Sequence, residues 1–157
     1  MAAPPDALTL KDWLIAGGWL LTVLGWLVSN LQANSRERRK EARAEVDACC
    51  DLIAELLDDA RAYYLKPGTD ADALPKASDI KFKMLRLLTR VERLERKAGT
   101  SDAVTHGGDL MDSITGGDFE QHTRLARVPT DPLFNRIESA SHFLMDSLEE
   151  SFAKAFP

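Results

Sequence analysis

The first third of the chain is divided between an apolar stretch and a charged one. Residues 13–29 contain no charged side chain, and leucines flank them on both sides. A helix needs about 20 mostly apolar residues to cross the hydrocarbon core of a bilayer, and indole rings such as those of Trp13 and Trp26 favour its two interfaces. The pattern predicts a transmembrane helix over residues 13–31, preceded by a short extracytoplasmic tail over residues 1–12.

Two other interpretations of the apolar stretch are open. It can be a buried helix of a soluble bundle, although a helix that is apolar around its whole circumference has no face for water. It can also be a secretory signal peptide. However, residues 1–12 contain one base and two acids instead of a basic region, and no clear cleavage site follows. The transmembrane interpretation is favoured over both.

Basic residues gather on the carboxyl side of the apolar stretch. This topology collar consists of Arg36, Arg38, Arg39, Lys40 and Arg43. On the amino side, Lys11 is offset by Asp6 and Asp12. Positively charged flanks of a membrane helix stay in the cytoplasm. The collar therefore predicts a single-pass protein of the bacterial inner membrane, with its N-terminus outside and residues 32–157 forming a cytoplasmic helical domain.

Small residues form a stripe within the apolar stretch, at i, i+4, i+7 and i+11. They are Gly18, Thr22, Gly25 and Ser29. At 100° per residue they lie close to one line along a helix, and such a line lets two helix backbones approach closely in lipid. The stripe predicts a homo-oligomer formed through the transmembrane helix. The alternative is that small residues are common in membrane helices and carry no such role.

Beyond the collar, hydrophobic residues recur at spacings of three and four, the period of amphipathic helices. The pattern predicts helices over residues 35–66, 79–97 and 131–155, and a broken helix over 109–126. The stripe of the first helix is shorter than three heptads, which favours a bundle core over a free dimeric coiled coil. The predicted fold class is all-α: one N-terminal transmembrane helix and a small cytoplasmic bundle of three long helices plus one or two short ones.

A line of bases runs beside the apolar stripe of the helix predicted over 79–97. It consists of Lys83, Arg86, Arg90, Arg93 and Lys97. The favoured interpretation is that these bases complement the acidic residues of the preceding helix, with the remainder solvated. A basic helix can also bind anionic lipid head groups or an acidic protein partner.

The composition is that of one compact domain. The chain has 157 residues, 45% of them hydrophobic, and a formal net charge of −5, which excludes a protein that binds nucleic acid through its overall charge. Cys49 and Cys50 are adjacent and lack a spaced second pair of metal ligands, so packing is their expected role. We expect no nucleic-acid partner.

Candidate chemistry is sparse. No Gly-x-Ser-x-Gly elbow, dinucleotide fingerprint or phosphate-loop motif occurs. Several acids and histidines of the region 106–122 can be assembled into a metal site on paper, namely His106, Asp109, Asp118, Glu120 and His122. The two histidines do not have the i, i+4 spacing of a helical histidine couple, so we expect no metal site, no cofactor and no catalytic residue.

The order of these features resembles small uncharacterised bacterial single-pass membrane-anchored helical proteins. The resemblance is carried by the apolar helix, the collar, the stretch Ser113–Glu120 with its Gly-Gly pair, and the terminal stretch Leu148–Phe152. It implies an architecture and no activity. The function expected is a membrane-anchored, non-enzymatic adaptor that presents its helical bundle to a cytoplasmic protein. The alternative is a phage-defence or toxin-like effector whose membrane helix oligomerises and permeabilises the membrane.

Overall fold

The computed structural model describes residues 10–98 and 102–156, and within these ranges the side chains of residues 10–12, 14–16, 97 and 98 lie outside the description. The chain divides into two compact units, Met1–Lys40 and Glu41–Pro157. Helix α1 (Leu10–Tyr64) belongs to both, because its helical segment continues past Lys40. The two units are treated separately below.

The predicted transmembrane helix over 13–31 is wrong. In the described part of the chain, no helix is long and apolar enough to cross a membrane. The predictions that depended on such a helix, an inner-membrane location with the N-terminus outside and the C-terminal domain in the cytoplasm, are overturned with it. The side chains of Leu14, Ile15 and Ala16, which the prediction counted, lie outside the described residues.

The length of the apolar run explains this correction. The uncharged run covers residues 13–29, between Asp12 and Asn30. At 1.5 Å per residue, this run covers about 26 Å of helix. A hydrocarbon core is roughly 30 Å thick. The prediction therefore depended on residues beyond the uncharged run to reach the required length.

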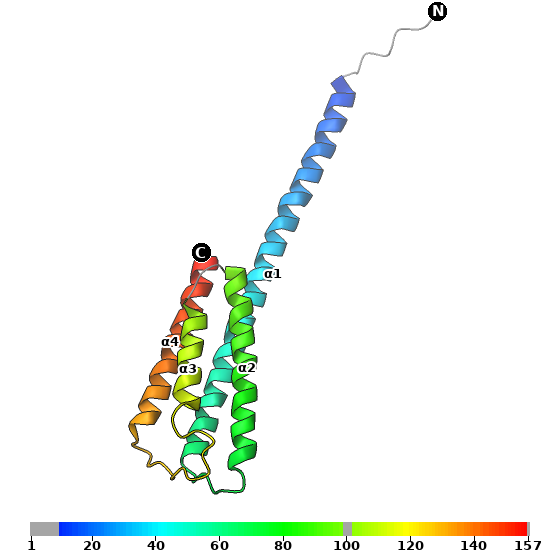
Figure 1. Ribbon diagram of the computed structural model, residues 1–157. Coiled ribbons are helices and arrows are strands. Elements are labelled where there is room, and N and C mark those ends of the chain that lie inside the picture. Colours follow the sequence, from blue (N-terminus) through cyan, green and yellow to red (C-terminus); the bar gives the residue numbers. More distant parts are fainter. Residues whose placement is uncertain (1–9, 99–101, 157) are drawn as a thin grey trace, which may run out of the picture. The chain divides into compact units, whose positions relative to one another are not determined.

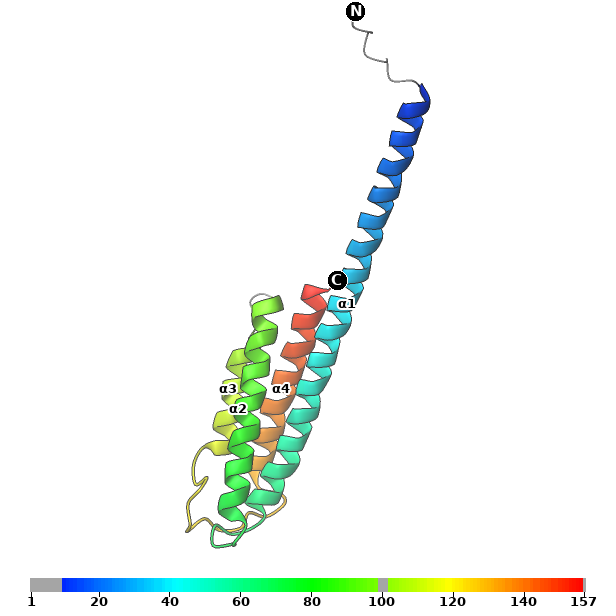
Figure 2. The ribbon, with the colours of Figure 1, turned by 90° about the vertical axis from the view of Figure 1, so that its right-hand side faces the viewer.

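The second unit is a helical bundle, as the sequence predicts. It contains the part of α1 from Glu41 onward, α2 (Ala73–Ala98), α3 (Ala103–Thr115) and α4 (Pro132–Ala155). These segments lie side by side, with α3 and α4 next to each other and α2 beside α3 (Figures 1 and 2). Among the described residues, all regular secondary structure is helical.

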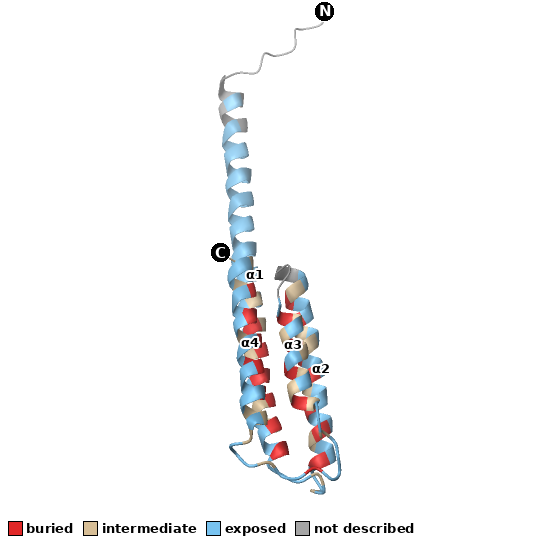
Figure 3. Cartoon of the chain, turned by 60° about the vertical axis from the view of Figure 1, so that its left-hand side comes forward, coloured by how far each residue is buried: buried red, intermediate tan, exposed pale blue. Residues whose placement is uncertain are grey.

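The core of the second unit is built from the apolar stripes of its helices, which face one another (Figure 3). The stripe of α1 is buried at Val46, Cys49, Ile53, Leu56, Ala60 and Tyr63. The stripe of α2 is buried at Ile80, Met84, Leu87, Val91 and Leu94. Gly107 of α3 lies so near Leu88 that a β-carbon there would crowd its side chain, so the glycine permits close packing of α2 and α3.

Several element boundaries differ from the sequence prediction, and α3 begins at Ala103 instead of residue 109. Helix α2 begins at Ala73 instead of Asp79, because Pro75 lies in its first turn, where the missing amide hydrogen costs no helical hydrogen bond. The helix predicted after the Gly-Gly pair is absent, and in the described chain α3 ends at Thr115 and residues 116–131 form a loop. Asp131 caps α4 by accepting a hydrogen bond from the Leu133 amide at 2.9 Å.

Candidate functional site

The end of the bundle where α1 stops carries its most elaborate polar structure. The loop over residues 116–131 packs against the last turn of α1, which ends in the pair Tyr63 and Tyr64. Both rings are buried, and Phe119 of the loop lies 5.0 Å from the Tyr63 ring, measured between centroids. The aromatic pair therefore gives the loop an apolar platform.

Arg124 fixes this loop to α1. Its side chain is buried, and Nη1 donates to the carbonyl oxygens of Tyr63 and Lys66, both at 3.0 Å. The guanidinium carbon lies 3.9 Å from the centroid of the Tyr63 ring, a cation–π distance. Nε and Nη2 have no hydrogen-bond partner in the described structure, so the aromatic face is their compensation for lost water.

Backbone contacts complete the attachment. The amide of Arg127 donates to the Tyr64 carbonyl, and the amide of Gly68 donates to the Arg124 carbonyl, both at 2.8 Å. A β-carbon at Gly68 would collide with the Gln121 carbonyl oxygen, so only glycine permits this approach. The loop is therefore held from both sides by polar contacts.

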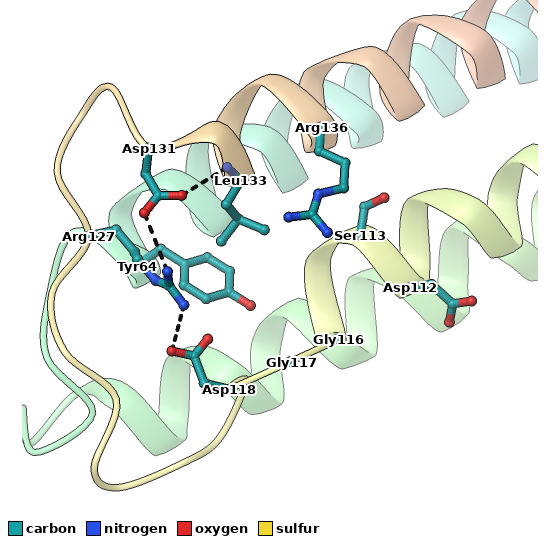
Figure 4. Close-up of a pocket in the computed structure, with 10 residues that line it drawn as sticks. All are labelled: Tyr64, Asp112, Ser113, Gly116, Gly117, Asp118, Arg127, Asp131, Leu133 and Arg136. Atoms are coloured by element: carbon teal, nitrogen blue, oxygen red, sulfur yellow. Dashed lines mark hydrogen bonds and ion pairs between the residues drawn. The ribbon is translucent and has the colours of Figure 1, made fainter.

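A cavity of about 260 Å³ lies between this loop and the facing ends of α3 and α4. Figure 4 shows the residues that line it: Tyr64, Asp112, Ser113, Gly116, Gly117, Asp118, Arg127, Asp131, Leu133 and Arg136. Arg136 extends from α4 toward α3, where Ser113 lies, while the Asp112 carboxylate points away from the other lining side chains. The cavity has a polar wall and is the strongest candidate for a small-molecule site in this unit.

The charges in the cavity are largely compensated. Arg127 lies 2.7 Å from an oxygen of Asp118 and 3.4 Å from one of Asp131, and its hydrogen bond with Asp118 raises its pKa above the ordinary value. The Tyr64 hydroxyl donates to the Ile114 carbonyl at 2.6 Å. Burial raises the pKa of Tyr64 to about 12, so the phenol stays protonated at neutral pH.

The described lining of the cavity contains a serine hydroxyl without an adjacent base. Ser113 is the hydroxyl nucleophile of the cavity, and in the described chain no histidine, lysine or carboxylate is hydrogen-bonded to it. Nucleophilic catalysis requires such a base within hydrogen-bond reach. The polar groups instead join the loop to three helix ends.

In the structure, the residues of the hypothetical metal site contact different partners. His106 and Asp109 lie one turn apart on α3 with a 3.5 Å contact, whereas Asp118 pairs with Arg127 and Glu120 pairs with Lys81. The described residues contain no group of three or more histidine, cysteine or acidic side chains arranged to hold a metal ion.

The line of bases on α2 is divided between two environments. Lys83 lies 2.6 Å from an Asp59 oxygen and 3.5 Å from both Glu55 and Asp79. Arg90 lies 3.8 Å from Glu45. Two members of the line therefore pair with the acidic flank of α1.

The other members of the line lie elsewhere. Arg86 and Arg93 are exposed and form no ion pair with any described residue, whereas the Lys97 side chain lies outside the description. Asp59 also contacts a second lysine, Lys76, which the sequence analysis did not include; its Nζ lies 2.5 Å from an Asp59 oxygen. Burial opposes ionisation of Asp59, but the hydrogen bonds from the two lysines outweigh it and lower the pKa of that carboxyl.

The small-residue stripe and the topology collar lie on α1. Gly18, Thr22, Gly25 and Ser29 are exposed, and the Thr22 hydroxyl donates to the Gly18 carbonyl at 2.9 Å. In the collar, Arg43 contacts Asp47 at 2.9 Å and Glu149 at 2.7 Å, whereas Lys40 lies 4.0 Å from Glu37. Arg36, Arg38 and Arg39 are exposed and make no ion pair with the described residues.

Sequence reasoning missed the loop attachment. Tyr63 was expected as part of a stripe, but nothing indicated that Arg124 and Arg127 would meet the end of α1. The available signal was the adjacent tyrosines followed by Pro67 and Gly68, because a helix end needs donors for its last carbonyls. Comparison with protein-family models, curated proteins and solved structures finds no match to this chain.

Proposed function

We propose that the protein is a non-enzymatic, self-associating interaction protein. The observation that carries the proposal is the exposed apolar part of α1. Its large side chains at Trp19, Leu21 and Trp26 are 65–71% exposed within the described structure. Exposed apolar surface of this extent is typical of an interaction site.

A leucine seam favours a second copy of the chain as the occupant. Leu20, Leu24, Leu27 and Leu31 follow spacings of four, three and four, which is the a/d pattern of a coiled coil. These four leucines are 43–69% exposed. An identical helix supplies the matching knobs and holes, so self-association removes the seam from water without requiring a second protein.

The polar cavity supports the non-enzymatic part of the proposal. Its one exposed base without an ion pair among the described residues is Arg136, and Ser113 has no activating partner there. The arrangement fits a structural joint that holds the end of the bundle. The second unit then serves as the surface that the assembly presents.

The seam is tested by measuring the mass of the full-length protein by light scattering in detergent-free, high-salt buffer, which screens contacts between exposed charges and leaves an apolar seam intact. We expect an oligomer for the native chain and a monomer for Leu24→Asp with Leu27→Asp. The matched control is Thr22→Asp with Ser29→Asp, which adds the same charge on the opposite side of the helix and should remain oligomeric.

Three results would overturn the proposal. A monomeric native chain contradicts self-association. Dissociation by the Thr22 and Ser29 changes, or by both pairs of changes, assigns association to a surface other than the seam. Recovery of the native chain only in the detergent-extracted membrane fraction contradicts an aqueous oligomer.

A further inference from the structure

The outward face of α2 carries exposed hydrophobic residues beside unpaired bases. Phe82 and Leu85 are 67% and 59% exposed. Arg86 lies next to them and Arg93 two turns further on, at positions that share one side of a helix. Neither arginine forms an ion pair with a described residue. We call Phe82, Leu85, Arg86, Thr89 and Arg93 the basic face.

The basic face has the composition of a protein-binding surface. Aromatic and arginine side chains are enriched at such surfaces. The Thr89 hydroxyl already donates to the Leu85 carbonyl at 2.8 Å, so it requires no partner across an interface. Glu92 is the exposed acid beside the face and leaves the two arginines in excess. An occupant must therefore offer acids around an apolar contact.

Another surface of the same chain offers this combination. Phe143 of α4 is 61% exposed and stacks on His106 of α3, with 6.0 Å between the ring centroids. Acids lie one turn from these rings, with Asp109 following His106 and Asp146 following Phe143. We call the surface formed by Asp102, His106, Asp109, Phe143 and Asp146 the acidic face.

Little within the chain neutralises the acidic face. Asp146 has no ion-pair partner among the described residues, and Asp109 contacts His106 alone, at 3.5 Å. Lys154, the nearest lysine along α4, lies 2.8 Å from Glu150 and also attracts Asp102, so Asp109 and Asp146 are the acids of the face without a lysine or arginine partner among the described residues. The acidic face therefore carries the opposite charge and, like the basic face, an exposed aromatic ring.

We infer that the basic face on α2 docks on the acidic face of α3 and α4 of a second copy of the chain. The two faces belong to different elements, so the contact is heterologous and each copy can bind two neighbours. Such contacts close into a ring or extend into a filament. This inference does not rest on the leucine seam, because all of its residues lie in the second unit.

The test uses the full-length chain with Leu24→Asp and Leu27→Asp, so that seam association does not obscure docking. Self-association is followed by sedimentation velocity over a range of protein concentrations at low salt. Arg86→Glu with Arg93→Glu, or Asp109→Arg with Asp146→Arg, should each weaken it about tenfold or more, because like charges then meet. An equimolar mixture of the two variants should associate as strongly as the parent.

The control is Arg36→Glu with Arg39→Glu, which makes the same charge change outside the second unit and should leave association unchanged. Monomeric behaviour of the parent, insensitivity to both face variants, or failure of the mixture to associate would overturn the docking inference. Failure of the seam is read separately, as an unchanged mass on Leu24→Asp with Leu27→Asp in high-salt buffer, where the charged faces are screened. In that case the face variants are compared in the native chain.

Discussion

The hydroxyl of Tyr64 donates a hydrogen bond to one atom, the carbonyl oxygen of Ile114. Ile114 is the penultimate residue of α3, so its carbonyl is among the last four of the helix and has no donor within it. The Tyr64 hydroxyl supplies that donor at 2.6 Å in a fully buried position. Tyr64→Phe removes one oxygen atom and leaves the carbonyl buried without a donor.

The expected cost follows from that loss. A buried polar group left without its partner costs about 1–3 kcal/mol. For a domain of this size, that loss lowers the melting temperature by about 3–15 °C. The free energy of unfolding is measured by urea titration, followed by far-ultraviolet circular dichroism. The tryptophans lie in the first unit and do not report on this site.

The matched control is Tyr63→Phe, which deletes the same atom one residue earlier. The Tyr63 hydroxyl accepts from the Glu120 amide at 3.0 Å in a half-buried position, where water can replace it. We expect a loss of about 0.5–1 kcal/mol. A Tyr64→Phe protein as stable as the native one, or a Tyr63→Phe protein that is the less stable of the two, would refute the reasoning.

The same hydroxyl predicts a pH dependence. Because burial raises the pKa of Tyr64 to about 12, the folded state holds this proton more tightly than the unfolded state does, whose pKa is about 10. The stabilisation is therefore fully present below pH 10 and is lost as the pH rises toward 12. Tyr64→Phe should lack this part of the alkaline loss, and an identical decline in both proteins would contradict the assignment.

Three further changes probe the second unit. Arg124→Met should cost about 2–4 kcal/mol, because the Lys66 carbonyl loses its donor and the Tyr63 carbonyl keeps only the Lys66 amide, and limited proteolysis should then cut the loop over residues 116–131; an uncut loop would contradict the attachment. Cys49, whose pKa burial raises to about 12, should react with a thiol reagent only after unfolding, and rapid labelling at neutral pH would contradict its burial. Asp59→Asn should remove stability above about pH 4 and leave the protein near native stability below it, because the carboxyl with the lowered pKa contributes only when ionised; equal losses at both pH values would contradict the ion pairs with Lys76 and Lys83.

The bundle and its core could be predicted from periodicity. Ile53 and Leu56 of α1 and Ile80 and Leu87 of α2 recur at spacings of three and four, and all are buried. The start of α2 could not be predicted, because Pro75 indicates a loop unless the helix begins just before it, and contacts of Ala73 and Ala77 with the core decide the matter. At the start of α2, burial of apolar side chains therefore outweighs the local preference for a loop.

The prediction of a transmembrane helix from the apolar stretch failed for a different reason. Hydropathy counts residues along the sequence, and the prediction over 13–31 needed nearly every one of them to reach the thickness of a bilayer. The candidate site was also beyond the reach of periodicity. Arg124 contacts the carbonyl of Tyr63, 61 residues away, and no repeat connects the two. Contacts of this kind depend on where the loop passes in the folded chain.

The attachment of Arg124 to the end of α1 has a consequence for synthesis on the ribosome. The carbonyls of Tyr63 and Lys66 leave the exit tunnel long before the arginine that will bind them, which follows by 61 and 58 residues. Until then, water takes the place of the arginine at the Lys66 carbonyl, and the Tyr63 carbonyl has only the Lys66 amide as its donor. The nascent α1 and α2 therefore emerge before the end of α1 has its hydrogen bonds from Arg124. A chain truncated before Arg124 never acquires them.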